Sequence, residues 1–421
     1  LSSSSAASDV YKRQVQAFPA KWRLKALVLG LGASQLALPL ARLFSEDLLQ
    51  IAEWRGLYLF ELGLALTSLG CVFMLKLPPG DRFRTFEKLD FLTFALLATG
   101  VALLCAVLSL GRIDWWLEAP WIGYASAASI LLIMAGLCIE HNRSNPMLMT
   151  RWLGSGAIIR LALAVILIRM VLSEQSTGAV GFLQALNMSS QQMRMLYGVM
   201  LLGSIAGLAT SALTINPAHL LMPLVISLAL MAVGSVMDSF SSNLTRPANM
   251  YFSQFLLAFG GTFFLGPTMV LGTRNVLTNP RNLVSFSVLF GICQNLGGLI
   301  GSALLGTFQI VREKYHSSHI VEQLTLLDPQ VLARVQSGGA AYGKVIADPD
   351  LRTLQGIRSL ATAATREANV LAYNDVFMLI AVIAVLTMIW IFIRSLWLMS
   401  TTQAIAPAAP APVQQSGASS S

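Results

Sequence analysis

Residues 285–320 read SFSVLFGICQNLGGLIGSALLGTFQIVREKYHSSHI, and this stretch decides the fold class. Its apolar part, about 283–309, is long enough to cross a bilayer as one helix, since about 20 apolar residues suffice. One face of that helix carries small and amide side chains at helical spacing. They are Gly291, Gln294, Gly298 and Gly301, with Asn295 and Ser302 beside them. Small residues let membrane helices approach closely, and amides need partners inside protein. We therefore expect this face to turn towards other helices or a polar cavity, with the three glycines packed on a neighbouring helix and the two amides, Gln294 and Asn295, the hardest to explain by packing alone.

The composition is typical of a membrane protein. Hydrophobic residues make up 55% of the 421 residues and charged residues only 11%, whereas a soluble domain carries about 25% charged residues. The four cysteines lie within apolar runs without paired spacing, as small core residues do. The net charge of +8 comes from short loops between apolar runs, which favours membrane orientation over nucleic-acid binding. We predict an all-α polytopic protein of the cell membrane, with the lipid bilayer as a partner and no nucleic acid.

Ten apolar spans can be read along the chain. They lie at about 24–44, 56–76, 89–110, 121–139, 155–173, 195–213, 218–236, 250–273, 283–309 and 376–398. The fifth span either ends near 173 or continues to about 186 as one long or broken helix. Thirteen Lys and Arg of the short loops lie on one side of the spans and four on the other. Because Lys and Arg accumulate on the cytoplasmic side, we predict a cytoplasmic C-terminus and an external 310–373 loop.

The 310–373 loop is charged and rich in helix-forming residues. We expect two surface helices in it, within 312–327 and 349–370, on either side of a break at Gly338 and Gly339. Three titratable residues of the first helix recur at helical spacing. They are His316, His319 and Glu322. This spacing suits metal ligands, but a solvated helix face gives the same pattern, and we predict no metal site.

Charged side chains inside apolar spans are costly and are usually paired or functional. Glu61 lies in the second span between LYLF and LGLAL, where a buried carboxylate can bind and release a proton or form a structural ion pair. Arg160 and Arg169 are nine residues apart in the fifth span and so lie on opposite faces of a helix. We expect Arg160 to face the interior, where it compensates Glu61 or holds an anionic substrate. We expect Arg169 to reach towards the outer surface.

Further polar residues lie near the predicted outer ends of the spans. We place Glu174 and Gln175 at the outer mouth, and we take Gln184, near the entrance to the sixth span, as a cavity candidate. Asn374 and Asp375 precede the tenth span, where we expect them to cap the helix.

Several short patterns occur in order along the chain. They are Glu53-Trp54-Arg55, Lys88-Leu89-Asp90-Phe91, Gly111-Arg112-Ile113-Asp114-Trp115, Asn145-Pro146-Met147-Leu148 and Tyr373-Asn374-Asp375-Val376-Phe377. Together with the segments 260–269 and 283–320, they resemble the fourteen-span drug:proton antiporters (QacA/EmrB type) of the major facilitator superfamily. In the matching stretch of the first span, Pro39 of that family's antiporter motif is kept, while Leu38 and Ala41 stand where glycines are expected.

The resemblance implies a helical bundle of fourteen spans, of which this chain holds the last ten. Residues 15–76 would finish the N-terminal bundle, 77–150 would form two extra linker spans, and 151–400 would form the C-terminal six-helix bundle. Residues 1–14 share no character with the rest and are expected to be non-native or disordered. The 401–421 tail, rich in Ala, Pro and Ser, is expected to be disordered.

The function that follows is secondary active transport, in which protons drive export of a small organic or drug-like compound by alternating access. Glu61 would couple the proton. The substrate cavity would be lined by Arg160, Gln184, Gln294 and Asn295. No cofactor is expected, and the resemblance implies a periplasmic adaptor as a further partner. Two alternatives stay open: a non-transporting scaffold or sensor, and an intramembrane enzyme. We predict no enzyme, because the four histidines lie in loops or at span ends.

Overall fold

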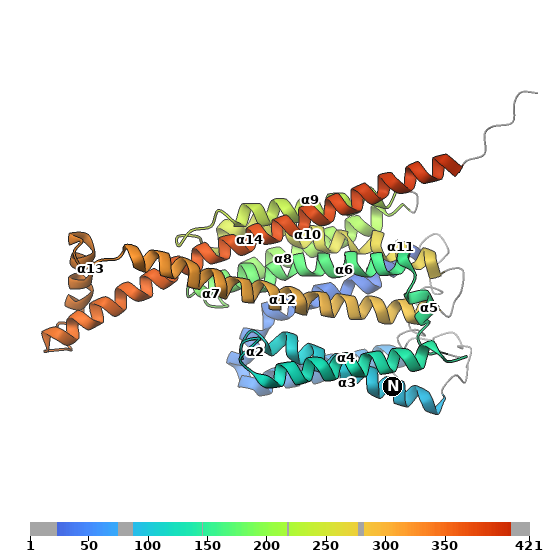
Figure 1. The fold of residues 1–421 in the computed structure, drawn as a ribbon, viewed down its shortest axis with the longest axis horizontal. Helices are drawn as coiled ribbons and strands as arrows, with labels where there is room; N and C mark the ends of the chain where they lie inside the picture. Colours follow the sequence, from blue (N-terminus) through green and yellow to red (C-terminus); the bar gives the residue numbers. More distant parts are fainter. Residues whose placement is uncertain (1–22, 75–86, 145, 217–218, 277–281, 406–421) are drawn as a thin grey trace, which may run out of the picture.

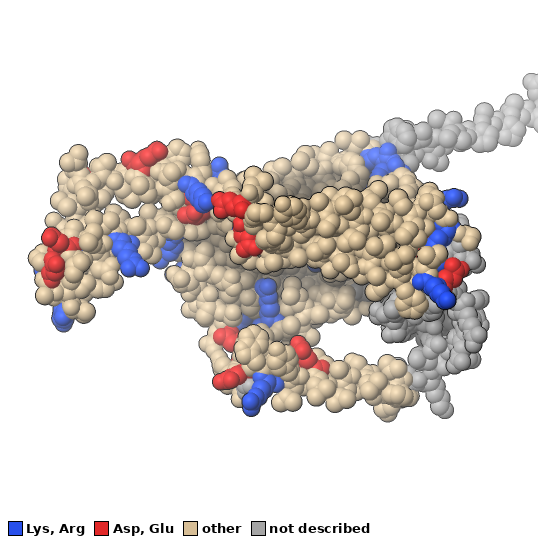
Figure 2. Space-filling model, turned by 60° about the horizontal axis from the view of Figure 1, so that its bottom comes forward, with Lys and Arg blue, Asp and Glu red and all other residues tan. Residues whose placement is uncertain are grey.

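The computed structural model describes residues 23–74, 87–144, 146–216, 219–276 and 282–405. All regular structure in these ranges is helical, and ten of the helical segments are long and apolar enough to cross a membrane. Charged side chains gather towards the two ends of the elongated molecule, while the sides of the helices between them are mostly uncharged (Figure 2). The prediction of an all-α polytopic membrane protein is confirmed.

The first two spans belong to one helical element, α2 (Arg23–Met74), which doubles back on itself (Figure 1). Its two arms are Val28–Ile51 and Glu53–Met74. At the turn, Glu53 has a φ of 51°, in the left-handed region that few residues other than glycine adopt. The first arm packs on α8 (Arg194–Thr214), and Arg194 Nη2 pairs with Asp47 Oδ2 at 2.8 Å. The second arm is exposed along almost its whole length.

The next two spans, α3 (Lys88–Leu110) and α4 (Pro120–His141), form a packed pair. Arg143, which follows α4 in the chain, binds three carboxylates. Its guanidinium contacts Asp90 at 2.5 Å, Glu87 at 2.7 Å and Glu140 at 3.0 Å. The hydrogen bond to Asp90, followed by that to Glu87, raises the pKa of Arg143 above its ordinary value. The pair also contacts α12, where Trp116, in the connection between α3 and α4, donates from Nε1 to Thr307 Oγ1 at 2.8 Å.

The fifth span takes the longer of its two predicted forms. After the short α5 (Thr150–Leu153), the chain forms α6 (Gly156–Ser173), a π-helical segment η1 (Glu174–Ala179) and α7 (Val180–Ala185) without interruption. A π-helical turn inside an α-helix frequently marks a functional site. Here it carries Glu174 and Gln175.

Three spans then form a tightly packed group. They are α8, α9 (Leu221–Asp238) and the segment Pro247–Gly272, which comprises η2 (Pro247–Met250), α10 (Tyr251–Phe263) and part of α11 (Leu265–Val276). Gly203 and Gly207 of α8 lie against the backbone of α10, where an added Cβ would come within 2.8 Å of Phe255 O and 2.3 Å of Phe259 O. This small-xxx-small spacing is how membrane helices bring their backbones together.

The last helices are longer than the spans predicted for them. α12 is Asn282–Gln323, α13 is Pro329–Ala340 and α14 is Pro349–Ile405. The ends of α12 and α14 project beyond the bundle together with α13 (Figure 1). The expected helices of the 310–373 loop are therefore extensions of membrane helices. The predicted break is wrong, because Gly338 and Gly339 lie within α13, where they let it cross α14 closely at Gly356 and Arg352.

The length of α14 also overturns the capping role of Asn374 and Asp375, which lie in mid-helix. Asp375 Oδ2 instead accepts from Arg312 Nε and contacts His316 Nε2, each at 2.6 Å. His316 is thus part of an ion-pair cluster between α12 and α14. No group of three potential metal ligands occurs in the described ranges. α14 runs to Ile405, into the predicted tail, and residues 1–14 and 406–421 lie outside the described part of the chain.

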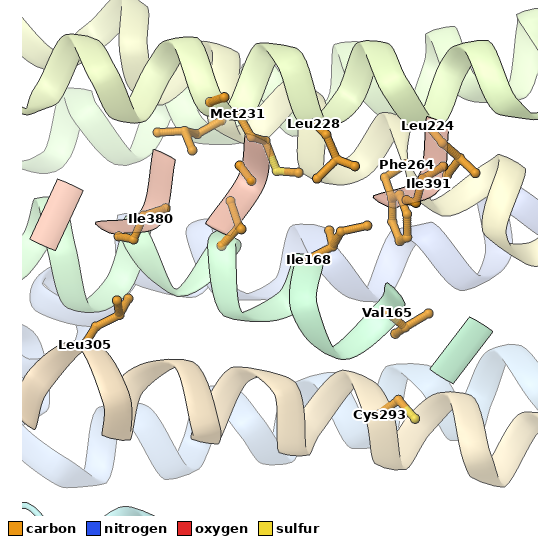
Figure 3. Packing of buried hydrophobic residues seen from close by; sticks show 14 of the residues in the cluster. Val165, Ile168, Leu224, Leu228, Met231, Phe264, Cys293, Leu305, Ile380 and Ile391 are labelled. Atoms are coloured by element: carbon orange, nitrogen blue, oxygen red, sulfur yellow. The ribbon is translucent and has the colours of Figure 1, made fainter. Parts of the chain in front are cut away.

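A single large apolar cluster holds α6, α9, α12 and α14 together. Figure 3 shows Val165 and Ile168 of α6 between Cys293 and Leu305 of α12 on one side and the α9 residues, such as Met231, on the other. This arrangement packs one face of α6 against α9, α12 and α14.

The glycines of α12 divide into two kinds, and only part of the packing prediction is correct. Gly301 packs on α6, since an added Cβ would lie 2.3 Å from Ser173 Oγ and 2.9 Å from Met170 Cα. Gly297, which was not predicted, does the same at Arg169 and Ile166. Gly298 has room for a Cβ, and nothing lies within 4 Å of one at Gly291. The packing stripe is therefore Gly297 and Gly301, a GxxxG pair.

Candidate functional site

A cavity of about 840 Å³ lies where the first arm of α2 meets the bundle. α2, α6, η1, α8, α10, α11 and α12 all contribute to its walls. The wall contains apolar side chains together with hydroxyl and amide groups. Its polar members include Gln35, Gln175, Ser176, Gln294, Asn295 and Ser302. A cavity of this size, largely apolar with a few polar groups, has the character of a small-molecule site.

Arg169, which comes from α6, is a half-buried cation in the wall of this cavity. Its Nε donates to the backbone oxygen of Gln294 at 3.1 Å, and its Nη1 donates to Gln35 Oε1 at 3.2 Å. The guanidinium therefore joins α6, α12 and α2 through neutral acceptors. In the described part of the chain, no carboxylate lies within ion-pair distance of it. A guanidinium has five N–H donors, so Arg169 retains the charge and the donors to bind an anion.

Arg42 is the second charged residue of the cavity wall, and it comes from the first arm of α2. Its guanidinium carbon lies 5.4 Å from the centre of the Tyr197 ring, a cation–π distance. Among the described residues that line the cavity there is no Asp or Glu. The charged groups of the wall are thus both positive, and its electrostatic field favours negative ligands.

Gln294 and Asn295 both line the cavity, where the sequence placed them. Gln294 Oε1 is buried without a hydrogen-bond partner. Asn295 Nδ2 donates to Gly291 O at 3.0 Å, one turn earlier in the same helix. Pro39, the residue kept from the antiporter motif, also lines the cavity. The structure thus assembles part of the predicted set in one place, together with Gly291, whose missing side chain leaves open space there.

Arg160 and Gln184 lie elsewhere. Both are exposed and neither contributes to the cavity wall. The sequence correctly indicated that Arg160 and Arg169 occupy opposite faces of one helix, but the inward one is Arg169, because its turn of α6 packs on Gly297 of α12. Gln184 follows the π-helical segment at the end of α7, beyond the cavity.

Glu61 also lies away from the cavity. It is exposed on the second arm of α2, among side chains that are themselves exposed. Its proton-coupling role stays a prediction, but no described residue brings it near the cavity wall or gives it an ion-pair partner.

A buried acid pair is the feature that the sequence did not reveal. Glu174 of η1 and Asp238 at the end of α9 are 0% and 3% exposed, and Gln254 of α10 lies between them. The sequence placed Glu174 at the outer mouth and did not single out Asp238. The π-helical lengthening of the fifth span turns Glu174 inward instead.

Comparisons with known proteins do not add a family assignment. No protein-family model matches the chain, and no curated protein matches it. The inference of function therefore rests on the residues and the geometry described above.

Proposed function

We propose that this protein is a secondary transporter that carries a small organic anion across the membrane by alternating access, with protons supplying the energy. The observation that carries the proposal is the cavity of about 840 Å³ whose charged wall residues are Arg42 and Arg169. A cavity among membrane helices that contains a few polar and charged groups is where transporters bind substrate. A scaffold would gain nothing from an arginine held there without a carboxylate partner, because removing a charge from water is costly.

The charge of the wall selects the substrate class. A planar guanidinium binds a carboxylate or sulfonate through two parallel hydrogen bonds. The apolar part of the wall, which includes Leu172, Phe286 and Phe290, suits an organic body attached to that anion. The substrate is therefore an amphipathic anion rather than the cationic drug that a carboxylate-lined cavity would take.

The sequence resemblance supports the wider assignment. The patterns shared with the fourteen-span drug:proton antiporters occur in order along the chain, and they imply export from the cytoplasm, the cell membrane as location and a periplasmic adaptor as partner. Lys and Arg in the short loops favour a cytoplasmic C-terminus. These points belong to the proposal as expectations about the whole protein.

The test is a binding measurement on the full chain in lipid nanodiscs. Two fluorescent dansyl probes of equal length, one ending in a carboxylate and the other in a quaternary ammonium, are titrated by fluorescence anisotropy. The carboxylate probe should bind and the ammonium probe should not. Arg169→Gln should weaken binding of the carboxylate probe by about tenfold or more, since a charged hydrogen bond contributes about 1.5–3 kcal/mol.

Arg160→Gln is the matched control on the same helix. Because Arg160 is exposed and outside the cavity wall, binding of the carboxylate probe should change by less than about twofold, as for a remote surface charge. Tighter binding of the ammonium probe, or equal losses in the two arginine variants, would contradict the proposal.

A further inference from the structure

The buried acid pair is separate from the cavity wall and has a geometry of its own. Gln254 Nε2 donates to Glu174 Oε1 at 3.0 Å, to Glu174 Oε2 at 3.1 Å and to Asp238 Oδ2 at 2.8 Å. Ser253 Oγ donates to Asp238 Oδ1 at 2.5 Å. One amide group therefore bridges two carboxyl groups that come from distant parts of the chain. All four side chains belong to residues that are at most 3% exposed.

The hydrogen-bond donors around the pair are too few for two ionised carboxylates. An amide NH2 has two hydrogens and a hydroxyl has one, whereas each carboxylate offers about four acceptor positions. At the same place an acceptor lacks a donor, because Gln254 Oε1 is buried without a hydrogen-bond partner. Protonation of one acid adds a donor and removes an acceptor, so a single bound proton reduces the shortage of donors around the two carboxyl groups while Gln254 Nε2 keeps its contacts with both.

The charge of the pair is not compensated by a cation. In the described ranges, no Lys, Arg or His forms an ion pair with Glu174 or Asp238. The helices packed around them carry other charged or titratable groups, but none is joined to either acid by a hydrogen bond or ion pair. Groups of this kind on those helices include Arg169 on α6, Tyr251 on α10, Arg312 on α12, and Tyr373 and Asp375 on α14. Two adjacent carboxylates in an apolar bundle cannot both be ionised without a large cost.

The acid pair lies between two hollows. Asp238 and Ser253 line a second pocket of about 330 Å³, formed with the connection between α9 and α10. That connection lies at the end of the bundle from which α13 projects (Figure 1). On the other side, Gln175 lines the central cavity, and its Nε2 donates to Gln254 O at 3.2 Å. The pair thus separates the central cavity from a pocket at one end of the molecule.

We propose that Glu174 and Asp238 share one bound proton, with Gln254 as the bridging residue, and that this proton exchanges with the solution through the pocket lined by Asp238. The ligand of this site is a proton. Its use as the coupling ion rests on the proposed transport function, whereas the presence of the proton does not. Glu174 and Asp238, instead of the exposed Glu61, are then the residues that load and release it.

Infrared spectroscopy of the full chain in nanodiscs tests this directly. A protonated carboxylic acid has a carbonyl stretch that ionised carboxylates lack, and this band shifts in D2O. At neutral pH the wild-type protein should show such a band, which should disappear as the pH is raised. Glu174→Gln should remove the band, and because Gln has the shape of the protonated acid, the variant should remain monodisperse. Carbon-13 labelling of Glu or Asp carboxyl groups should move the band in the unmutated protein, which assigns it even if a variant fails to fold.

Several results would overturn the inference. They are the absence of the band at neutral pH, its persistence in both Glu174→Gln and Asp238→Asn, its loss in Glu61→Gln, and its loss when choline is replaced by Na⁺, which would assign the site to a metal cation. The outcome is independent of the dansyl-probe titration. If the band is present but the carboxylate probe does not bind, the proton site stands and the transport proposal is refuted. If the probe binds but the band is absent, the anion-binding cavity stands and the shared proton is refuted.

Discussion

The second arm of α2, Glu53–Met74, and the span Gly156–Ala185 are both apolar helical segments. Each carries an acidic residue, but the two residues differ in burial. Glu61 on the arm is exposed, whereas Glu174 in the span is fully buried against Gln254. The difference comes from what packs on each helix. The span packs on α10, α12 and α14, while the arm is exposed along almost its whole length. The chemistry of a charged residue in an apolar span is therefore set by its partners and not by the span.

The largest loss of stability is expected on removing a charged side chain that forms several ion pairs. Arg143→Met leaves Asp90 and Glu140 buried and Glu87 without its cation. Removing one member of a buried ion cluster costs about 3–5 kcal/mol. The free energy of unfolding, measured by SDS titration in mixed micelles, should fall by that amount. Arg55→Met, at an exposed site on the α2 arm, should change it by less than about 0.5 kcal/mol, as surface substitutions do. Equal losses would show that the arm is packed as firmly as the α3–α4 pair.

A smaller effect is expected from filling the α12–α6 contact. A side chain at Gly301 would meet Ser173 and the backbone of Met170, so Gly301→Leu should lower the free energy of unfolding by about 1–3 kcal/mol. Gly70→Leu on the α2 arm is the matched substitution. Nothing lies within 4 Å of a Cβ there, and replacing a helical glycine gains up to about 1 kcal/mol. Destabilisation by Gly70→Leu would mean that the arm has a neighbour at that position.

The two faces of α12 can be separated with single methyl groups. Gly297→Ala should destabilise, because the new Cβ would lie 2.7 Å from the Cβ of Arg169 and 3.0 Å from Ile166 O. We expect a cost of about 1 kcal/mol, at the lower end of overpacking. Gly291→Ala should be neutral or slightly stabilising, since this position faces open space in the cavity. SDS titration of both variants in parallel measures the two free energies of unfolding. If Gly291→Ala were the more destabilising variant, the packing face of α12 would lie at Gly291.

The smallest effect is expected at Glu61. Because this side chain is exposed and does not line the cavity, Glu61→Gln should leave both the free energy of unfolding and the affinity for the carboxylate probe unchanged within error. Thermal melting and the anisotropy titration measure the two quantities. A loss of affinity of tenfold or more would restore Glu61 to the site.

The sequence predicts the ten spans because a long apolar run with few charges is typical of a helix that crosses a bilayer. The sequence also predicts that Gln294 and Asn295 line a cavity, because helical spacing places them on a different face of α12 from its aliphatic side chains. The same spacing put Arg160 and Arg169 on opposite faces but could not tell which face was inward. That depended on Gly297 of another helix. The GxxxG spacing of Gly297 and Gly301 was a readable signal for this contact, and the stripe through Gly291 and Gly298 obscured it.

The acid pair could not be found from the sequence. Glu174, Asp238 and Gln254 come from three elements. The contact between them depends on a π-helical segment that no residue pattern in the sequence predicts. The length of α12 and α14 was missed for a different reason. Helices were predicted in their charged outer parts, but the change from apolar to charged sequence was taken as the end of each span, whereas the helix continues through it.

The most direct test of an anion-binding cavity is an experimental structure of the protein with an iodinated aromatic carboxylate. We predict anomalous iodine signal within the cavity, with the carboxylate within hydrogen-bond distance of the Arg169 guanidinium and no signal for an iodinated quaternary ammonium at the same place. A carboxylate bound beside Arg160 or along the α2 arm, with the cavity vacant at saturating concentration, would contradict this prediction.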